Sequence, residues 1–407
     1  MSPTTKQEYA IFTVCNLAYL PKARVLAESV SRFNDAKLKI YLVEKKVPVD
    51  LSAIEAEIVW IEDVGIPNLL QLAFKYDIIE LSTSLKPYLT LKLFEIYEKV
   101  IFLDPDTCLY HSVAPILGDL DDHAIVLTPH YTTPQSDHLS ESDVGMMRFG
   151  SFNLGFYAVR DCQQTRDFLS WWSERCFQLC FMESQFGLSV DQKWVSIAPC
   201  FFKDIHVSFN LGYNVAPWNS YERSLTKDGG GRYIVNGSQP LVFFHFSNFD
   251  ETDLEYLNKR SLPEKNVRRP DLLEIGAAYK EALARKATKA ASMKYGFDYM
   301  SGGEYISPTL RRAYACILEE LPPGHDPFDS AGAVGDFARN NSLLERNASP
   351  YKAVRLADVP RNGFQFKVIY FFMRIVLRVI GPNRFQNFAR LLVYLSSYRQ
   401  NRGLWKY

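Results

Sequence analysis

The sequence lacks an excess of either charge, because its 407 residues include 46 Lys and Arg and 46 Asp and Glu. The overall charge therefore indicates no nucleic acid partner. The seven cysteines form no CxxC pair or zinc-like cluster, which favours free thiols in a reducing compartment. No apolar run reaches the roughly 18 residues of a membrane span, and residues 1–8 lack the apolar core of a signal peptide. We therefore expect a cytoplasmic protein.

Short apolar runs alternate with segments of helical spacing through the first 250 residues. Hydrophobic residues make up 47% of the chain and charged residues 23%, values that are typical of a globular protein. The alternation indicates an α/β fold in which helices flank a largely parallel sheet. The expected strands are 9–15, 39–43, 57–61, 99–103 and 152–159, and the expected helices are 20–33, 84–97 and 161–180.

Three regions differ in composition. Residues 1–250 carry the strand and helix pattern and form the expected catalytic domain, whereas residues 251–362 are polar, with weak helices such as 274–291, and form an adjunct region. Residues 363–407 form a helical tail. Within the first region, the polar segment 136–150 is typical of a loop that covers a ligand site.

The tail is basic, with nine Lys and Arg and no Asp or Glu from Arg361 to Tyr407. Segments 364–380 and 385–398 combine apolar residues with a charged face, which predicts basic amphipathic helices. Such helices lie on an anionic membrane surface or pack on the protein or at a dimer interface. Both interpretations stay open; the first would place the protein peripherally on the inner face of the membrane.

The strongest chemical motif is Phe102-Leu-Asp104-Pro-Asp106-Thr, at the end of the apolar strand 99–103. Residues two apart in an extended chain point to the same side, so both carboxylates can hold one hard divalent cation and, through it, a diphosphate. Ligands of open α/β sheets collect at the carboxyl ends of strands. A cation there would neutralise charge on a departing nucleoside diphosphate. A solvated turn is the alternative for an isolated Asp-x-Asp pair.

His245 ends a second apolar run, Val242-Phe-Phe-His245. An imidazole beside two carboxylates is a plausible ligand set for Mn²⁺. A histidine in an apolar run is otherwise more often a hydrogen-bonded core residue, so this prediction depends on Asp104 and Asp106.

Two further segments combine amides, a carboxylate and a glycine. Asp191-Gln192 either places polar groups near a sugar or begins a helix with Asp191 or Ser189 as its N-cap. Asn153-Leu-Gly155 places an amide and a glycine in a strand, where glycine often marks a bulge or a close approach to a ligand. A turn at the strand end is the alternative.

These motifs together resemble glycosyltransferase family 8, and within it the bacterial lipooligosaccharide galactosyltransferases. Asp104-Pro-Asp106, Asn153-Leu-Gly155, Asp191-Gln192 and His245 occur in the order and spacing of that family. The resemblance covers about residues 9–250. It implies a GT-A fold, transfer with retention of anomeric configuration, and Mn²⁺, or Mg²⁺, held by Asp104, Asp106 and His245.

The resemblance also implies roles for other residues. Asp191 and Gln192 would lie at the sugar, with Gln192 near the anomeric carbon. Tyr213 and Trp218 belong to a polar segment expected near the acceptor, or they pack between domains. The implied donor-binding residues are Thr13, Asn16, Lys86, Asp104 and Asn153.

The sequence departs from the family at two places. The first loop, Thr13-Val-Cys15-Asn16, lacks the acidic residues that commonly bind uracil, so the base stays open although a UDP-sugar is favoured. After His245 the usual glycine and lysine are replaced by Phe246-Ser247-Asn248. Lys86, Arg148 or the glycine-rich loop 227–232 would then contact the diphosphate.

The sequence therefore predicts a glycosyltransferase that moves a hexose from a nucleotide-diphosphate sugar to a glycan or lipid-linked acceptor. A module that binds nucleotide sugar or glycan without turnover is the alternative from another class. A nucleotidyltransferase is disfavoured, because the residues after the first strand, Asn16-Leu-Ala-Tyr-Leu-Pro, are not a glycine-rich basic loop that cradles a triphosphate.

Overall fold

The computed structural model describes residues 6–135, 143–252, 254, 257, 269–344, 363–395 and 402–405. Contacts divide the chain into two compact units. The first contains residues 1–69 and 78–296, and the second contains residues 70–77 and 297–407. The domain boundaries expected at residues 250 and 362 stay a prediction, although α8 (Pro270–Arg285) groups with the first unit.

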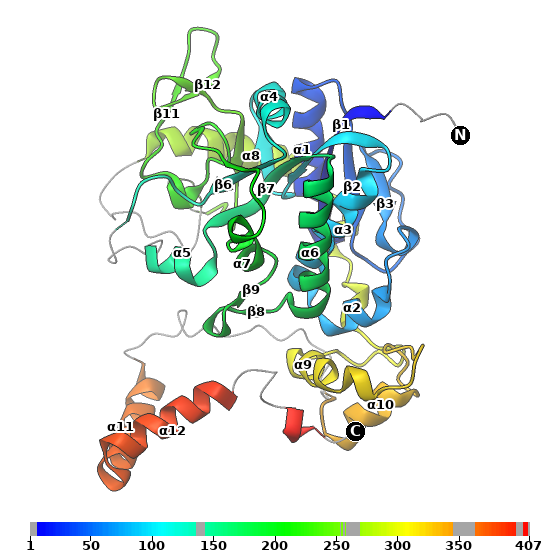
Figure 1. Cartoon of the computed structure of the whole chain (residues 1–407), viewed down its shortest axis with the longest axis vertical. Coiled ribbons are helices and arrows are strands. Elements are labelled where there is room, and N and C mark those ends of the chain that lie inside the picture. Colours follow the sequence, from blue (N-terminus) through cyan, green and yellow to red (C-terminus); the bar gives the residue numbers. More distant parts are fainter. Residues whose placement is uncertain are drawn as a thin grey trace. The chain divides into compact units, whose positions relative to one another are not determined.

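The first unit is built on a mixed sheet, seven-stranded in the described residues, with the order β10-β6-β7-β4-β1-β2-β3 (Figure 1). Neighbouring strands are parallel except at β7, which runs antiparallel to both β4 and β6. The strands are β1 (Gln7–Cys15), β2 (Leu38–Leu42), β3 (Glu57–Trp60), β4 (Tyr97–Leu103), β6 (Ile125–Pro129), β7 (Phe152–Arg160) and β10 (Ile205–Val207).

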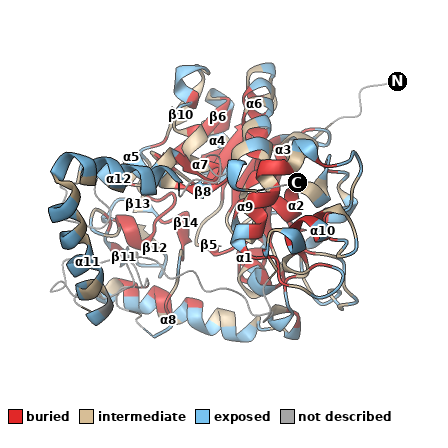
Figure 2. Cartoon of the chain, turned by 90° about the horizontal axis from the view of Figure 1, so that it is seen from below, coloured by how far each residue is buried: buried red, intermediate tan, exposed pale blue. Residues whose placement is uncertain are grey.

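Helices cover both faces of this sheet because alternate side chains of each strand face opposite sides. Ile101 of β4 packs in a core with residues of α1 (Leu20–Phe33) and α4 (Ala114–Asp122). Phe102 stacks on Tyr157 of β7, whose hydroxyl hydrogen-bonds Thr90 of α3 (Ile78–Leu93) at 2.7 Å. Trp172 of α6 (Gln163–Leu179) packs edge-on against Tyr157. The central strands are accordingly buried (Figure 2).

Small sheets and short helices complete the first unit. β5 (Thr107–Leu109) pairs with β14 (Phe243–His245), and β8 (Met182–Glu183) pairs with β9 (Leu188–Ser189). A third sheet contains β11 (Leu225–Lys227), β12 (Tyr233–Val235) and β13 (Gln239–Pro240). The short helices are α5 (Asp143–Phe149) and α7 (Gln192–Val195).

The expected α/β class is confirmed, and the bounds of α1 match the expected helix 20–33. Two expectations were wrong in detail. α3 begins at Ile78 rather than at residue 84, and residues 143–149 of the expected covering loop form α5. A seven-residue helix that contains Gly145 gives only a weak periodic signal in the sequence. Residues 136–142 of that expected loop lie outside the described residues.

The second unit is mainly helical, as expected for the C-terminal part of the chain. Its helices are most of α2 (Leu69–Lys75), α9 (Pro308–Ile317), α10 (Ala333–Asn340), α11 (Phe364–Ile380) and α12 (Pro382–Leu395). The buried Arg311 of α9 donates hydrogen bonds to the carbonyls of Ala73, Phe74, Tyr76 and Phe297 and to Asp298. This one guanidinium ties residues 70–77 to the rest of the unit.

The basic helices predicted in the tail are present as α11 and α12. Figure 2 shows both mainly in the colour of exposed residues. No helix in the described part of the chain is both long and apolar enough to cross a bilayer.

Candidate metal and donor site

Asp104 and Asp106 lie where the central strand β4 ends. The backbone N–H of Asp104 donates to the carbonyl of Gly155 on β7 at 2.8 Å. Asp106 directly precedes β5, and its carbonyl accepts a hydrogen bond from the N–H of Phe246 at 2.8 Å. The backbone of Asp104 is therefore fixed to β7, and the backbone of Asp106 is fixed to the residue that follows β14.

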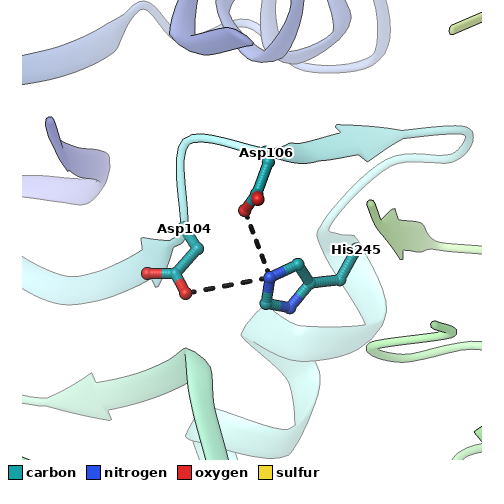
Figure 3. Close-up of side chains that lie close together, drawn as sticks. All are labelled: Asp104, Asp106 and His245. Atoms are coloured by element: carbon teal, nitrogen blue, oxygen red, sulfur yellow. Dashed lines mark ion pairs between the residues drawn. The ribbon is translucent and has the colours of Figure 1, made fainter. Parts of the chain in front are cut away.

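His245 completes a group of three ligands. It is the last residue of β14 and lies opposite Thr107 of β5. Its Nε2 is 3.2 Å from Oδ1 of Asp106 and 3.8 Å from Oδ2 of Asp104 (Figure 3). One ligand atom from each of the three residues lies within 4.8 Å of the others. The structure therefore brings together the three residues that the sequence predicted as metal ligands.

This donor set fits a divalent cation. Bonds from such a cation to carboxylate oxygen or imidazole nitrogen are about 2.0–2.6 Å long, so one ion can bridge atoms within 4.8 Å of one another. Burial raises the pKa of Asp106, but hydrogen bonding to His245 and the charges of His245 and Lys22 outweigh it, so its pKa lies below the usual value. Asp106 is therefore ionised and able to coordinate a cation.

Lys22 is a neighbour of this group that the sequence analysis missed. It belongs to the first turn of α1, and its Nζ lies 3.5 Å from Oδ2 of Asp106 and 4.2 Å from the ring centre of Tyr19. Its side chain is 21% exposed, so its charge is accessible to a ligand. The available signal was a basic residue shortly after the first strand, in the region that the resemblance assigns to the nucleotide.

Lys86 connects the carboxylate pair to Asp191. Its Nζ lies 3.4 Å from Oδ1 of Asp104 and 3.2 Å from Oδ2 of Asp191, and it donates to the carbonyl of Leu154 at 2.9 Å. Burial lowers the pKa of Lys86, but Asp104 and Asp191 more than offset it, so the pKa is raised. Lys86 is buried in the middle of α3 and is therefore not a solvated lysine at a helix end.

Asp191 is a buried carboxyl with an unusual proton affinity. Burial raises its pKa to about 6; the charge of Lys86 partly opposes the effect of burial, and the charge of Asp104 adds to it. It occupies the N-cap position of α7, yet its side chain makes no capping hydrogen bond. The preceding Val190 has φ of 44°, which is costly for a β-branched residue. The chain is therefore strained where it directs Asp191 towards Lys86.

The amide of Gln192 bridges two loop segments. Its Nε2 donates to the carbonyl of Phe149 at 3.0 Å, and its Oε1 accepts from the N–H of Leu154 at 3.4 Å. Asn153, two residues before Gly155, hydrogen-bonds Asn214 at 3.0 Å. Both predicted sugar-binding amides thus lie on the segments that border Asp104 and Lys86.

The first loop contains Thr13 and Asn16. Thr13 is fully buried, and its hydroxyl has no hydrogen-bond partner among the described residues. Asn16 caps a short helix, since its Oδ1 accepts from the N–H of Tyr19 at 3.2 Å. Their role in donor binding stays a prediction.

The two aromatic residues expected near the acceptor occupy different surroundings. Trp218 packs edge-on against His245, with ring centres 5.1 Å apart, and donates to the carbonyl of His130 at 2.9 Å. Tyr213 lies in the core, where it packs on Phe243. Only Trp218 therefore lies at the candidate site.

Arg148 and the loop 227–232, both predicted to contact the diphosphate, carry exposed cations. Arg148 lies at the end of α5 and donates to Ser184 at 3.0 Å. In the loop between β11 and β12, Asp228 accepts hydrogen bonds from Gly230 and Arg232. No hydrogen bond links these groups to the Asp104 site among the described residues, so Lys22 and Lys86 are the cations that border it.

Comparisons with known proteins found similar sequences and similar solved structures. No family model matches. Two uncharacterized proteins of Bacillus subtilis strain 168 are similar: YfnF is 25% identical over 187 residues, and YfnD is 27% identical over 188 residues. These matches cover 46% and 45% of this chain, and the chain spans 60% and 58% of the length of the two relatives.

Solved structures that are similar include the galactosyltransferase LgtC in complex with donor and acceptor sugar analogs. It is 17% identical with a TM-score of 0.41, and the match covers 69% of this chain and 96% of LgtC. GlyE of Streptococcus pneumoniae TIGR4, a glycosyltransferase, is 15% identical with a TM-score of 0.38, over 73% of this chain and 67% of GlyE. Mouse xyloside xylosyltransferase 1 is 13% identical with a TM-score of 0.37, over 59% of this chain and 97% of that protein.

Proposed function

We propose that this chain is a glycosyltransferase with a GT-A-like catalytic domain, which transfers a hexose from a nucleotide-diphosphate sugar to a saccharide acceptor. The observation that carries the proposal is the group formed by Asp104, Asp106 and His245 at the carboxyl end of β4. The order of the motifs, which resembles glycosyltransferase family 8, supports it. A UDP-sugar donor and retention of configuration follow from that resemblance.

The three ligands would hold Mn²⁺ or Mg²⁺, which neutralises charge on the departing diphosphate. Lys86 compensates the charges of the partly buried Asp104 and the buried Asp191, so that both carboxylates persist beside the donor. Lys22 presents a second positive charge on the side of Asp106. In this arrangement Asp191 and Gln192 contact the sugar, whereas Thr13 and Asn16 contact the nucleoside.

The first experiment measures thermal shifts with a panel of nucleotide sugars, with and without Mn²⁺, and then the release of nucleoside diphosphate. The expected result is a metal-dependent shift with one donor and slow donor hydrolysis. Asp104→Asn and Asp106→Asn should abolish both, whereas Asp122→Asn, at an exposed position on α4, should not. A folded Asp104→Asn protein that binds Mn²⁺ and donor normally would refute the metal assignment.

A second candidate function is a module that binds nucleotide sugar without turning it over. The amide of Gln192 is engaged by Phe149 and Leu154. Phe246, which follows His245, is buried and stacks on Tyr279 at 3.7 Å, so this position offers no charge to a diphosphate. Metal-dependent binding of a donor without any release of nucleoside diphosphate would favour this function.

We also propose that α11 and α12 place the enzyme on an anionic membrane surface, where a lipid-linked acceptor would be accessible. Phe371, Phe372 and Val379 are 61%, 59% and 77% exposed, while the cations of the two helices are unopposed by any acidic residue after position 361. Apolar burial and attraction to anionic lipid then act together.

Vesicle flotation tests this part of the proposal. The protein should bind vesicles that contain phosphatidylglycerol and should bind phosphatidylcholine vesicles much more weakly. Arg374→Glu with Arg378→Glu should abolish the difference. Equal binding by the wild type and by a chain that lacks residues 364–407 would show that the helices pack on protein instead.

A further inference from the structure

Four polar side chains form a hydrogen-bonded chain that starts at the candidate metal ligand His245. Nδ1 of His245 lies 3.2 Å from Oδ1 of Asn214, and Nδ2 of Asn214 donates to Oδ1 of Asn153 at 3.0 Å. Nδ2 of Asn153 lies 3.4 Å from Nε2 of His130. Asn214 is 1% exposed and His245 is 3% exposed, so the link between them is shielded from water.

The backbone of Gly155 sets the direction of this chain. A backbone N–H can only donate, and that of Gly155 points at Oδ1 of Asn153 at 3.1 Å. The group of Asn214 that faces the same oxygen must therefore be its NH₂, whose second hydrogen goes to Thr128 at 3.0 Å. The oxygen of Asn214 then faces His245, so Nδ1 of His245 must carry the proton.

The His130 end of this hydrogen-bonded chain requires the same donor-to-acceptor direction. Nδ1 of His130 lies 3.4 Å from the carbonyl of Ser151, which can only accept, so this nitrogen carries the proton. Nε2 of His130 is then a lone pair that accepts from Asn153. Burial lowers the pKa of His130 to about 4, although the Ser151 carbonyl partly opposes this, so the ring is neutral at physiological pH.

The consequence at the metal site is geometric. Because the protonated Nδ1 of His245 faces Asn214, Nε2 is the nitrogen that faces Asp104 and Asp106 and is the one available to a cation. A ring so close to β7 is possible only because residue 155 is glycine. A Cβ there would lie 2.6 Å from Nδ1 of His245.

We propose that Asn214 is a positioning residue that orients His245 for the cation and, through the same amide, orients Asn153. Both lone pairs of the Asn153 oxygen are occupied, by Asn214 and by Gly155. Asn153 therefore offers a ligand only an N–H, which suits a hydroxyl or phosphate oxygen. The inference rests on the proposed function for its metal site, but not for turnover.

The test compares two substitutions of Asn214 that differ in what they keep. Asn214→Asp keeps an acceptor for His245 but loses both donors, whereas Asn214→Ala loses all three groups. Loss of an outer-shell partner typically weakens metal binding about 10–100-fold. We expect Asn214→Ala to weaken Mn²⁺ binding by about that factor and Asn214→Asp to bind Mn²⁺ within about threefold of the wild type.

Asn68→Ala is the matched control, because Asn214 and Asn68 share a left-handed backbone, with φ of 51° and 53°, and Asn68 is exposed. Mn²⁺ binding is measured by electron paramagnetic resonance of the free ion. Equal loss of binding in Asn214→Asp and Asn214→Ala would show that Asn214 only supports the fold and would overturn the proposal. Unchanged binding in both would overturn it as well.

The tautomer is tested separately on metal-free protein labelled with ¹⁵N-histidine. His245 is assigned by its loss in His245→Ala, and its Nδ1 should show the shift of a protonated nitrogen. Asn214→Ala should reduce that signal, whereas Asn68→Ala should not. A wild-type His245 protonated on Nε2 alone would refute the donor-to-acceptor direction inferred for the hydrogen-bonded side chains. Neither measurement needs a sugar donor, so both stay informative if glycosyl transfer is not the activity.

Discussion

Gly155→Ala should displace the imidazole of His245 while leaving its chemical groups intact. Residue 155 has no left-handed backbone that would demand glycine, so alanine is excluded by space alone. The added Cβ would lie 2.6 Å from Nδ1 of His245, whereas unstrained contacts are about 3.5–4.0 Å. The imidazole must therefore move by about 1 Å.

A movement of this size breaks a metal bond, because such bonds tolerate deviations of only about 0.2 Å. We expect Mn²⁺ affinity to fall by at least about 100-fold, the upper end of what loss of an outer-shell partner causes. Overpacking should also cost about 1–3 kcal/mol of unfolding free energy. Gly118→Ala is the control, since a Cβ at that exposed position on α4 meets nothing within 4 Å.

The assay is a Mn²⁺ titration of the four proteins of a cycle: wild type, Gly155→Ala, His245→Ala and the double variant. If Gly155→Ala acts only through the imidazole, the double variant should bind no more weakly than His245→Ala. A folded Gly155→Ala protein with wild-type affinity would refute the reasoning, because the ring would not then be held against β7 when it binds metal.

Three further predictions concern charges that the fold buries. Lys86→Met should lower the unfolding free energy by about 3–5 kcal/mol, because it leaves the carboxylates of Asp104 and Asp191 without their cation; an unchanged denaturant midpoint would contradict this. The pKa of Asp191 is raised in the folded state to about 6, so the folded state holds a proton that the unfolded state has released above about pH 4. The bound proton therefore contributes about 3 kcal/mol to the unfolding free energy below pH 4, and this contribution is lost as the pH rises towards 6. In metal-free buffer, Asp191→Asn should therefore lose less stability than the wild type between pH 4 and pH 7, and parallel pH profiles would show that Asp191 is not shifted. Arg311→Met should lower the unfolding free energy of the second unit by about 3–5 kcal/mol, because it leaves buried carbonyls and Asp298 unpaired. The control Arg339→Met, at an exposed position on α10, should cost under about 0.5 kcal/mol. Equal urea midpoints for the two variants would contradict this prediction.

The sequence by itself determined the class of the fold and pointed to the three residues of the candidate metal site. Apolar periodicity is a local property, so α1 and α11 could be predicted with their bounds, and α12 to within a few residues. Asp104, Asp106 and His245 were recognisable because each lies at the end of an apolar run, and strand ends meet at one edge of a sheet. The antiparallel direction of β7 was not predicted, since an apolar run reads alike in either direction.

Only the tertiary structure decided the surroundings of those ligands. Lys86 and Asp191 are 105 positions apart in the chain, and neither carries a local signal for the other. Asn214 and His130 were not predicted at all, because single polar residues have many satisfied roles in a fold. The role of these residues depends on the direction of their hydrogen bonds. The N–H of Gly155 and the carbonyl of Ser151 orient two amides and two imidazoles, and backbone groups acquire such orientations only when the strands have packed.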